Sequence, residues 1–204
     1  MSILLTKPQI EAALPKVAQG LTQYRWLQAN LKAVDVRVSP LFRTRFNHFY
    51  RVRRNDEWQN SFYELLESLK NEGQTVEFSF VLISLFHATD RFEASFASKL
   101  LATINPQMPV IDSVVLRNLS LRLPYPHSMN RLERTLELHA KLRSSFFDFL
   151  QSEDGRYLVK QFRERFEGDE VTETKMLDLV LWQTRPISKS SARYLSGEFH
   201  HDGR

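Results

Sequence analysis

The sequence predicts an all-α protein of about nine helices. Nonpolar residues recur every three or four positions along most of the chain, which is the spacing of a buried helix face. Ser, Thr or Asp before these runs and Gly or Pro after them mark helix ends. No run of useful length alternates polar and nonpolar residues as a half-buried strand does. We expect one helical globular domain over residues 1–186, alternatively divided into two lobes at about 1–74 and 75–186, followed by a loose tail over 187–204.

The N-terminal segment begins with a helix signature. Thr6 and Gln9 form a capping-box pattern, in which each residue satisfies the other's backbone N–H. Pro15 should kink or split this helix because it lacks an N–H group. A second amphipathic stretch then follows over 21–31, and the alternating segment 33–38 predicts a short extended connector.

Three helices are expected next. Ser39 and Pro40 open the first, and Asp56 caps the second, which should end at Gly73. Thr75 caps the third, over 76–88. That segment is nonpolar nearly all round, so it should occupy a central position in the fold.

The remaining chain predicts five helices around a loop with two prolines at 122–127. Asn105 and Pro106 end the first of these helices, and Gly155 marks a break after the long third one. The five helices are expected over 96–104, 113–119, from Ser128 to about 154, 156–166 and 173–185.

Composition excludes several classes of site. The chain has no Cys, which excludes disulfides, thiolate zinc sites, Cys nucleophiles and Cys-bound iron–sulfur clusters. It has six Gly and no glycine-rich phosphate-loop motif, and no His spacing is typical of metal ligands. We therefore expect no metal and no cofactor. The N-terminus lacks a basic region and a cleavage signal, and no nonpolar run is long enough to span a bilayer, so we expect a cytoplasmic protein without a membrane partner.

Positive charge is concentrated between residues 32 and 54. This stretch holds seven Lys or Arg and one acid, in a chain with a net charge of +4. Such a basic face predicts a polyanionic partner, and arginine suits phosphate oxygens because its planar fork donates in pairs. The alternative is a solvated face paired with acids such as Glu57 and Glu64. The interleaved aromatic residues share one helix face and are expected in the core. The expected phosphate contacts are Arg43, Arg45, His48, Arg51, Arg53 and Arg54.

Asp112 stands alone in the nonpolar run "MPVIDSVVL". The simpler interpretation is that it only caps the helix after it. The functional interpretation rests on the same position at the start of a helix. A helix N-terminus offers free N–H groups and partial positive charge, and both favour the ionised form of the carboxylate. A carboxylate held this way can stabilise an oxocarbenium-like transition state and orient a water, as glycosidic cleavage requires.

The segment "PVIDSVVLR", residues 109–117, resembles the region around the catalytic aspartate of helix-hairpin-helix DNA glycosylases. The helix "FASKLLATI" and the segment "LDLVLWQTR" are similar to helices of that family, over about residues 75–185. The resemblance implies a two-lobed all-α fold with a cleft, double-stranded DNA as partner, and excision of a flipped, damaged or mismatched base. Asp112 would be the catalytic carboxylate, and Arg117 joins the DNA-binding residues.

The sequence departs from the family pattern at three places. The stretch before Lys99 has no Gly-x-Gly hairpin, and the place of the family's lyase lysine falls at Glu93 or Ala94. Val114 replaces a residue that is often polar. Lys99 as a nucleophile would need a depressed pKa, and its alternative is an ordinary cation. Glu93 is a second candidate acid, or else a helix-start residue.

These departures keep two kinds of function open. The first is a monofunctional DNA N-glycosylase, a hydrolase. The second is a non-catalytic helical module with a degenerate glycosylase fold that binds nucleic acid or protein. An RNA binder, which needs no cleft, is a third possibility. The sequence does not identify the base or the oligomeric state.

Overall fold

A computed structural model describes residues 3–167 and 170–184, and over these residues the chain forms nine α-helices and no strand. The all-α prediction is therefore confirmed for this part of the chain. One turn of 3-10 helix, Gly73–Thr75, joins two of the helices. The helices are α1 (Lys7–Leu31), α2 (Pro40–Tyr50), α3 (Asp56–Leu69), α4 (Phe78–Thr89), α5 (Ala94–Ile104), α6 (Ser113–Asn118), α7 (Arg131–Gln151), α8 (Glu153–Arg165) and α9 (Glu173–Gln183).

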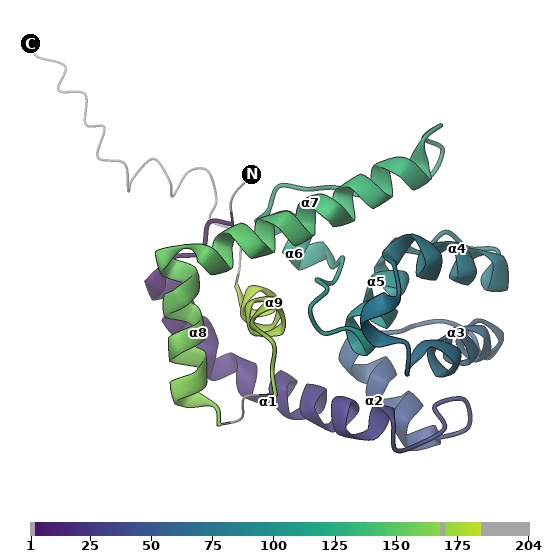
Figure 1. Cartoon of the computed structure of the whole chain (residues 1–204), viewed down its shortest axis with the longest axis horizontal. Coiled ribbons are helices and arrows are strands. Elements are labelled where there is room, and N and C mark those ends of the chain that lie inside the picture. Colours follow the sequence, from purple (N-terminus) through teal and green to yellow (C-terminus); the bar gives the residue numbers. More distant parts are fainter. Residues whose placement is uncertain (1–2, 168–169, 185–204) are drawn as a thin grey trace, which may run out of the picture.

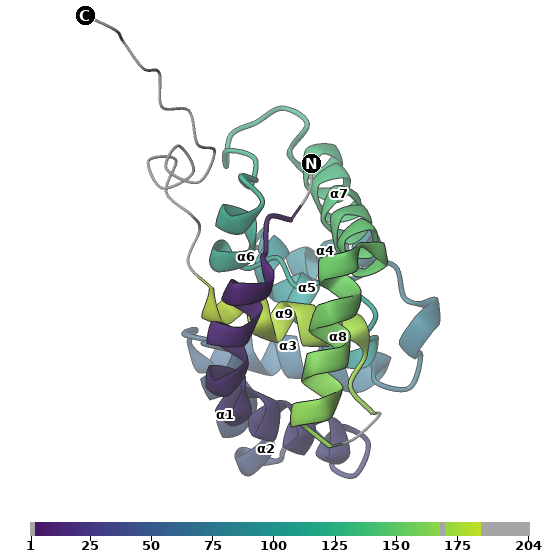
Figure 2. The same ribbon diagram turned by 90° about the vertical axis from the view of Figure 1, so that its left-hand side faces the viewer.

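Helix α9 lies among other helices. It contacts α1, α6, α7 and α8, and Figures 1 and 2 show it running between α1 and α8. Every residue from Thr174 to Leu181 is buried, including a lysine and an aspartate. A helix buried on all sides must satisfy its polar side chains internally, which makes these two residues candidates for more than packing.

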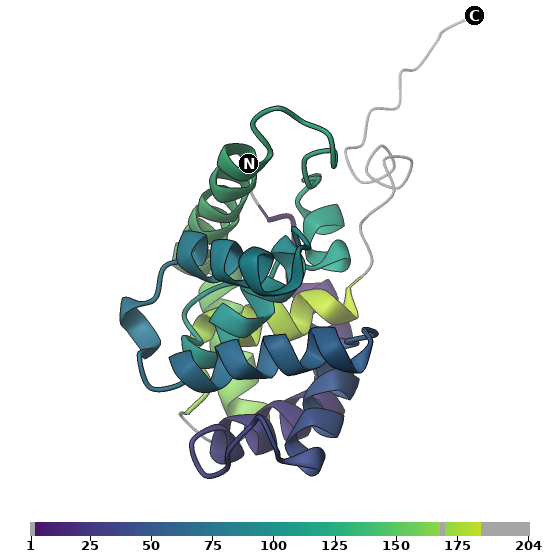
Figure 3. The same ribbon diagram turned by 90° about the vertical axis from the view of Figure 1, so that its right-hand side faces the viewer.

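Helices α3, α4 and α5 contact one another beside this group, and α2 packs on α1. Figure 3 shows α3 and α4 on the side of the molecule turned away from α8. The aromatic stripe of α2 enters the common core, as the sequence predicts. Its members are Phe42, Phe46, Phe49 and Tyr50, all buried, and the buried nonpolar side chains of the described residues form one continuous cluster.

Several sequence-based expectations about the elements are wrong. Pro15 does not split the first helix, because α1 continues through it to Leu31 with Ala13, Leu14 and Val17 buried against its neighbours. Residues 33–38 form turns rather than an extended connector, since Asp35 accepts backbone hydrogen bonds from residues 38 and 39.

Further corrections concern the place of α4, two N-caps and the position of a helix break. Helix α4 is not central: one face is exposed, with Phe80 54% accessible. The N-caps of α3 and α4 are Asn55 and Glu77 rather than the predicted Asp56 and Thr75. Gly155 lies inside the first turn of α8 and not at a break; the break falls at Ser152. The expected tail over 187–204 lies outside the described residues.

The segment that leads from α5 to Asp112 is held by side chains from other elements. The backbone N–H of Ile111 donates to Ser98 Oγ at 2.9 Å, and Thr172 Oγ1 donates to the carbonyl of Pro106 at 2.6 Å. Asp112 then begins α6, and its Oδ1 accepts the N–H of Val114 at 2.7 Å. The predicted cap is confirmed. Hydrogen bonds therefore hold both the backbone that precedes Asp112 and the side chain of Asp112 itself.

Candidate functional site

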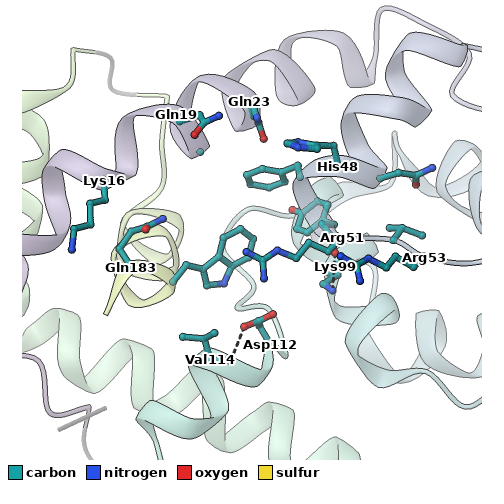
Figure 4. A pocket seen from close by; sticks show the side chains of 16 residues that line it. Lys16, Gln19, Gln23, His48, Arg51, Arg53, Lys99, Asp112, Val114 and Gln183 are labelled. Atoms are coloured by element: carbon teal, nitrogen blue, oxygen red, sulfur yellow. Dashed lines mark hydrogen bonds between the residues drawn. The ribbon is translucent and has the colours of Figure 1, made fainter. Parts of the chain in front are cut away.

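A cavity of about 640 Å³ opens where α1, α2, α5, α6 and α9 meet. Figure 4 shows the side chains that line it, contributed by opposite walls. Phe49, Tyr50 and Trp182 provide aromatic surface, and Gln19 and Gln23 present amides from α1. The volume is in the range of cavities that bind small ligands.

The charges around this cavity are unequal. Among the described residues that line it, Asp112 is the one acid, whereas Lys16, Arg51, Arg53 and Lys99 are cations. A concave surface with this balance concentrates anions near its mouth. The lone carboxylate then becomes the group toward which positive charge in a ligand would be drawn.

Asp112 combines a structural contact with access to the cavity. Oδ1 caps α6 through the N–H of Val114, and Oδ2 accepts no hydrogen bond from any described residue. The side chain is half-buried rather than walled off. One carboxylate oxygen therefore fixes the geometry, and the other is available to a ligand or a water.

Lys99 lies on α5 with 8% of its surface accessible. Its Nζ donates to the backbone carbonyl of Tyr50 at 3.1 Å and lies 4.9 Å from the centre of the Phe96 ring. Burial lowers the pKa of Lys99, while the carboxylates of Asp112 and Asp178 act in the opposite direction. Lys99 thus helps to fix the backbone at the end of α2.

Arg51 and Arg53 carry the free cations of the α2 wall. Arg51 is the C-cap of α2 with φ 54° and ψ 45°, a left-handed conformation that normally favours glycine. Its guanidinium has no ion pair or hydrogen bond within the described part of the chain, and the same holds for Arg53. The left-handed conformation of Arg51 is a common way for a helix to end, and Asp90 ends α4 in the same way, so only the unpaired side chains of Arg51 and Arg53 indicate a role in binding.

The structure does not bring the other predicted residues into this cavity. Glu93 Oε1 accepts hydrogen bonds from Arg54 at 2.9 and 2.5 Å, and neither residue lines the cavity. The other three predicted arginines also make contacts outside the cavity. Arg43 lies over the ring of Tyr63 and Arg45 over that of Trp26, and Arg117 donates to the carbonyl of Ser113.

Sequence reasoning missed the contribution of α1 and α9. Lys16, Gln19 and Gln23 recur at helical spacing on the polar face of α1, but such a face is usually only solvated. Trp182 and Gln183 lie at the end of α9 in the segment "LWQTR", whose polar residues could have drawn attention. No pattern along the chain indicates that the middle of α1 and the end of α9 line the same cavity.

A buried ion pair lies behind the aromatic wall. Lys175 Nζ is 2.7 Å from Asp178 Oδ2, and both residues are 1% accessible. Four aromatic rings surround the ammonium group, with their centres 5.1–5.9 Å from Lys175 Nζ; they belong to Tyr24, Phe49, Tyr50 and Trp182. Burial acts to lower the pKa of Lys175, but attraction to Asp178 outweighs it and raises the pKa. Burial raises the pKa of Asp178, which Lys175 opposes.

Two kinds of feature are absent from the described residues. No group of three or more His, Asp or Glu there could hold a metal ion. None of the described helices is both long and nonpolar enough to cross a bilayer.

Comparison with known proteins adds no relative. No protein-family model, curated protein or solved structure matches this chain. The resemblance of residues 109–117 to the glycosylases therefore stays a prediction.

Proposed function

We propose that this protein is a DNA glycosylase-like hydrolase that cleaves the N-glycosidic bond of a damaged or mismatched base held in the Asp112 cavity. The observation that carries the proposal is the position of Asp112 as the one acid among the described lining residues, beside four Lys or Arg. Departure of the base leaves positive charge on the sugar, and a carboxylate fixed beside that sugar stabilises the charge.

The cavity walls suggest how a nucleotide would be held. A base flipped out of the duplex needs a pocket with aromatic surface and hydrogen-bonding groups for its edge. Phe49 and Trp182 supply the first, and Gln19 and Gln23 supply the second. Arg51, Arg53 and His48 would meet the phosphates on either side of the flipped nucleotide.

Asp112 would act through its free oxygen, Oδ2. That oxygen would stabilise the sugar cation and orient the attacking water. Lys99 would not attack the sugar, because its Nζ is buried and donates to the carbonyl of Tyr50. The proposal is thus a monofunctional hydrolase with no covalent enzyme–sugar intermediate.

One observation favours a second candidate, a non-catalytic nucleic-acid-binding module. Asp112 and Lys99 both have structural partners, Val114 N–H and the Tyr50 carbonyl. A protein that only binds would keep these contacts and the free arginines, and would need no exposed carboxylate oxygen. The two candidates differ in base release and not in binding.

The test is a panel of duplexes, each with one damaged base, scored for abasic sites with the parent protein and with Asp112→Asn. Asparagine is as good an N-cap as aspartate, so α6 and DNA binding should be retained. We expect base release to fall by about 100-fold or more. Equal activity of the variant on a responsive duplex would remove Asp112 from the mechanism. Tight binding of duplex DNA without excision of any base would favour the second candidate, and preference for single-stranded RNA would contradict both the DNA substrate and the flipped base.

A further inference from the structure

The α6–α7 loop, residues 119–130, forms a second concave surface together with α7. Figure 2 shows this loop as an arch from the end of α6 to the start of α7. The cavity between them, here called the loop cavity, has a volume of about 350 Å³. Arg122 and Tyr125 line it from the loop, and Arg134 and Lys141 line it from α7. No described residue lines both this cavity and the one at Asp112, so the two are separate.

Positive charge predominates in the loop cavity. Its charged lining residues in the described part of the chain are Arg122, Arg134, Lys141 and Glu137, which gives a net charge of +2. All four are exposed, and their side chains form no ion pair or hydrogen bond within residues 3–167 and 170–184. Glu137 carries one negative charge and can offset one of the three cations. A concave surface with free cations attracts anions, and phosphate oxygens suit arginine well.

Tyr125 presents an aromatic ring in this cavity. It lines the wall, yet 80% of its surface is accessible. Pro124 and Pro126 flank it, and each proline fixes one backbone angle. The backbone N–H of Ser128 also donates to the carbonyl of Tyr125 at 3.0 Å and closes a turn. The ring is therefore presented on a stiff segment, which loses little conformational freedom when a ligand stacks on the ring.

The rest of the wall is mainly nonpolar. It includes Leu121, Leu123 and Leu138, and Leu123 is 42% accessible. A ligand that fits this cavity has a flat aromatic part, which lies against Tyr125 and Leu123, and an anionic part, which meets the cations. An unpaired nucleotide has both parts, because every base has a face that stacks on an aromatic ring and every phosphate is an anion. A base inside a duplex has both faces covered by its neighbours.

We propose that the loop cavity binds one unpaired nucleotide of a nucleic-acid strand, whose base stacks on Tyr125 and whose phosphates pair with Arg122 and Lys141. This site is independent of the proposed catalysis at Asp112 and involves no release of a base. The alternative is an exposed loop whose charged side chains are only solvated. That alternative predicts that no single side chain of the loop cavity affects binding, so variants distinguish the two.

The experiment measures binding to the full-length protein by fluorescence anisotropy. The labelled probes are oligothymidylate and oligouridylate of about ten residues, and an undamaged duplex. Tyr125→Ala should weaken binding of the single strands by about tenfold, because it removes the stacking ring. Tyr125→Phe keeps the ring and should bind as the parent does. Phe80→Ala removes an exposed ring of α4 and should leave binding unchanged. The tighter of the two strands identifies the sugar that the site prefers.

Charge variants test the phosphate contacts. Arg122→Gln and Lys141→Gln should each make the slope of log affinity against log salt shallower by about 0.7 for the single strands. Lys160→Gln, which removes an exposed cation of α8, should leave that slope unchanged. Glu137→Gln should strengthen binding, because it removes the acid that competes with phosphate for the cations. All of these side chains are exposed, so the Tm of each variant should match that of the parent.

Three results would overturn the proposal. The first is the absence of binding of either single strand at about 100 µM protein. The second is equal affinity of the parent and Tyr125→Ala for the single strands. The third is an equal loss of affinity for the single strands and the undamaged duplex in Tyr125→Ala, because a stacking ring has no free base to contact in a duplex. None of these results bears on base release at Asp112, which the damaged duplexes test.

Discussion

Single residues were predictable where local chemistry determines their role. Asp112 is an N-cap because a carboxylate before a nonpolar helix accepts a free N–H, and that contact is present at 2.7 Å. The partners of Lys99 and Glu93 were not predictable. Tyr50 lies 49 positions from Lys99, and Arg54 lies 39 from Glu93. Contacts over such separations follow from packing, which one sequence does not encode in any local spacing.

His139 should make the stability of the fold depend on pH. Burial lowers its folded pKa to about 4 from the ordinary 6.5, so as pH falls the unfolded chain takes up this proton before the folded protein does. The stabilisation is complete above about pH 6.5 and is lost between 6.5 and 4. We expect the parent to lose about 2 kcal/mol more of unfolding free energy than His139→Phe between pH 7 and pH 4.5, measured by urea denaturation. Equal losses would show that His139 does not titrate with unfolding.

At the scale of elements, periodicity predicted most helices and failed where position in the fold matters. Helix α4 is nonpolar nearly all round, but Phe80, Ile83 and Phe86 are exposed. Helix α9 includes a lysine and an aspartate, yet every residue from Thr174 to Leu181 is buried. The hydrophobicity of a helix indicates which of its faces could be buried, whereas the neighbouring elements in the fold determine which faces are buried. Pro15 is tolerated in α1 for a related reason: tertiary packing on both sides of it outweighs the loss of one backbone hydrogen bond.

The junction of α7 and α8 gives a prediction about Gly155. A Cβ at this position would lie 1.9 Å from the carbonyl oxygen of Phe149, so Gly155→Ala requires the two helices to separate. We expect a loss of about 2–4 kcal/mol in unfolding free energy, seen as a drop in Tm by scanning calorimetry.

Gly20 provides the matched control for that measurement. It lies in the middle of α1, and the nearest atom to its Cβ would be Leu179 Cδ2 at an ordinary 3.7 Å. Gly20→Ala should therefore leave Tm unchanged or raise it, since alanine favours a helix interior by about 1 kcal/mol over glycine. Similar effects of the two substitutions would mean that the close approach at Gly155 is relieved at little cost.

At the scale of the whole molecule, the candidate site is formed by residues from several helices, and no single segment of the sequence predicts it. Its walls come from α1, α2, α5, α6 and α9, and only the α2 and α6 contributions carry a recognisable pattern. The basic stretch also divides in space, because Arg51 and Arg53 face the cavity whereas Arg43 and Arg45 lie over aromatic rings. A count of charges along the chain predicts a basic face and does not say which arginines are free.

That division predicts different outcomes for two adjacent arginines in DNA binding. Arg53 is exposed and unpaired, so Arg53→Gln should weaken binding to duplex DNA and make the slope of log affinity against log salt shallower by about 1, with Tm unchanged. Arg54 is held by Glu93, whose side chain is 12% accessible and whose Oε2 already lacks a partner. Arg54→Gln should therefore lower the unfolding free energy by about 1–3 kcal/mol and leave the salt slope nearly unchanged. Fluorescence anisotropy over a salt series, with a thermal melt of each variant, separates the two effects, and a shallower slope for Arg54→Gln alone would place the phosphate contacts on a different surface.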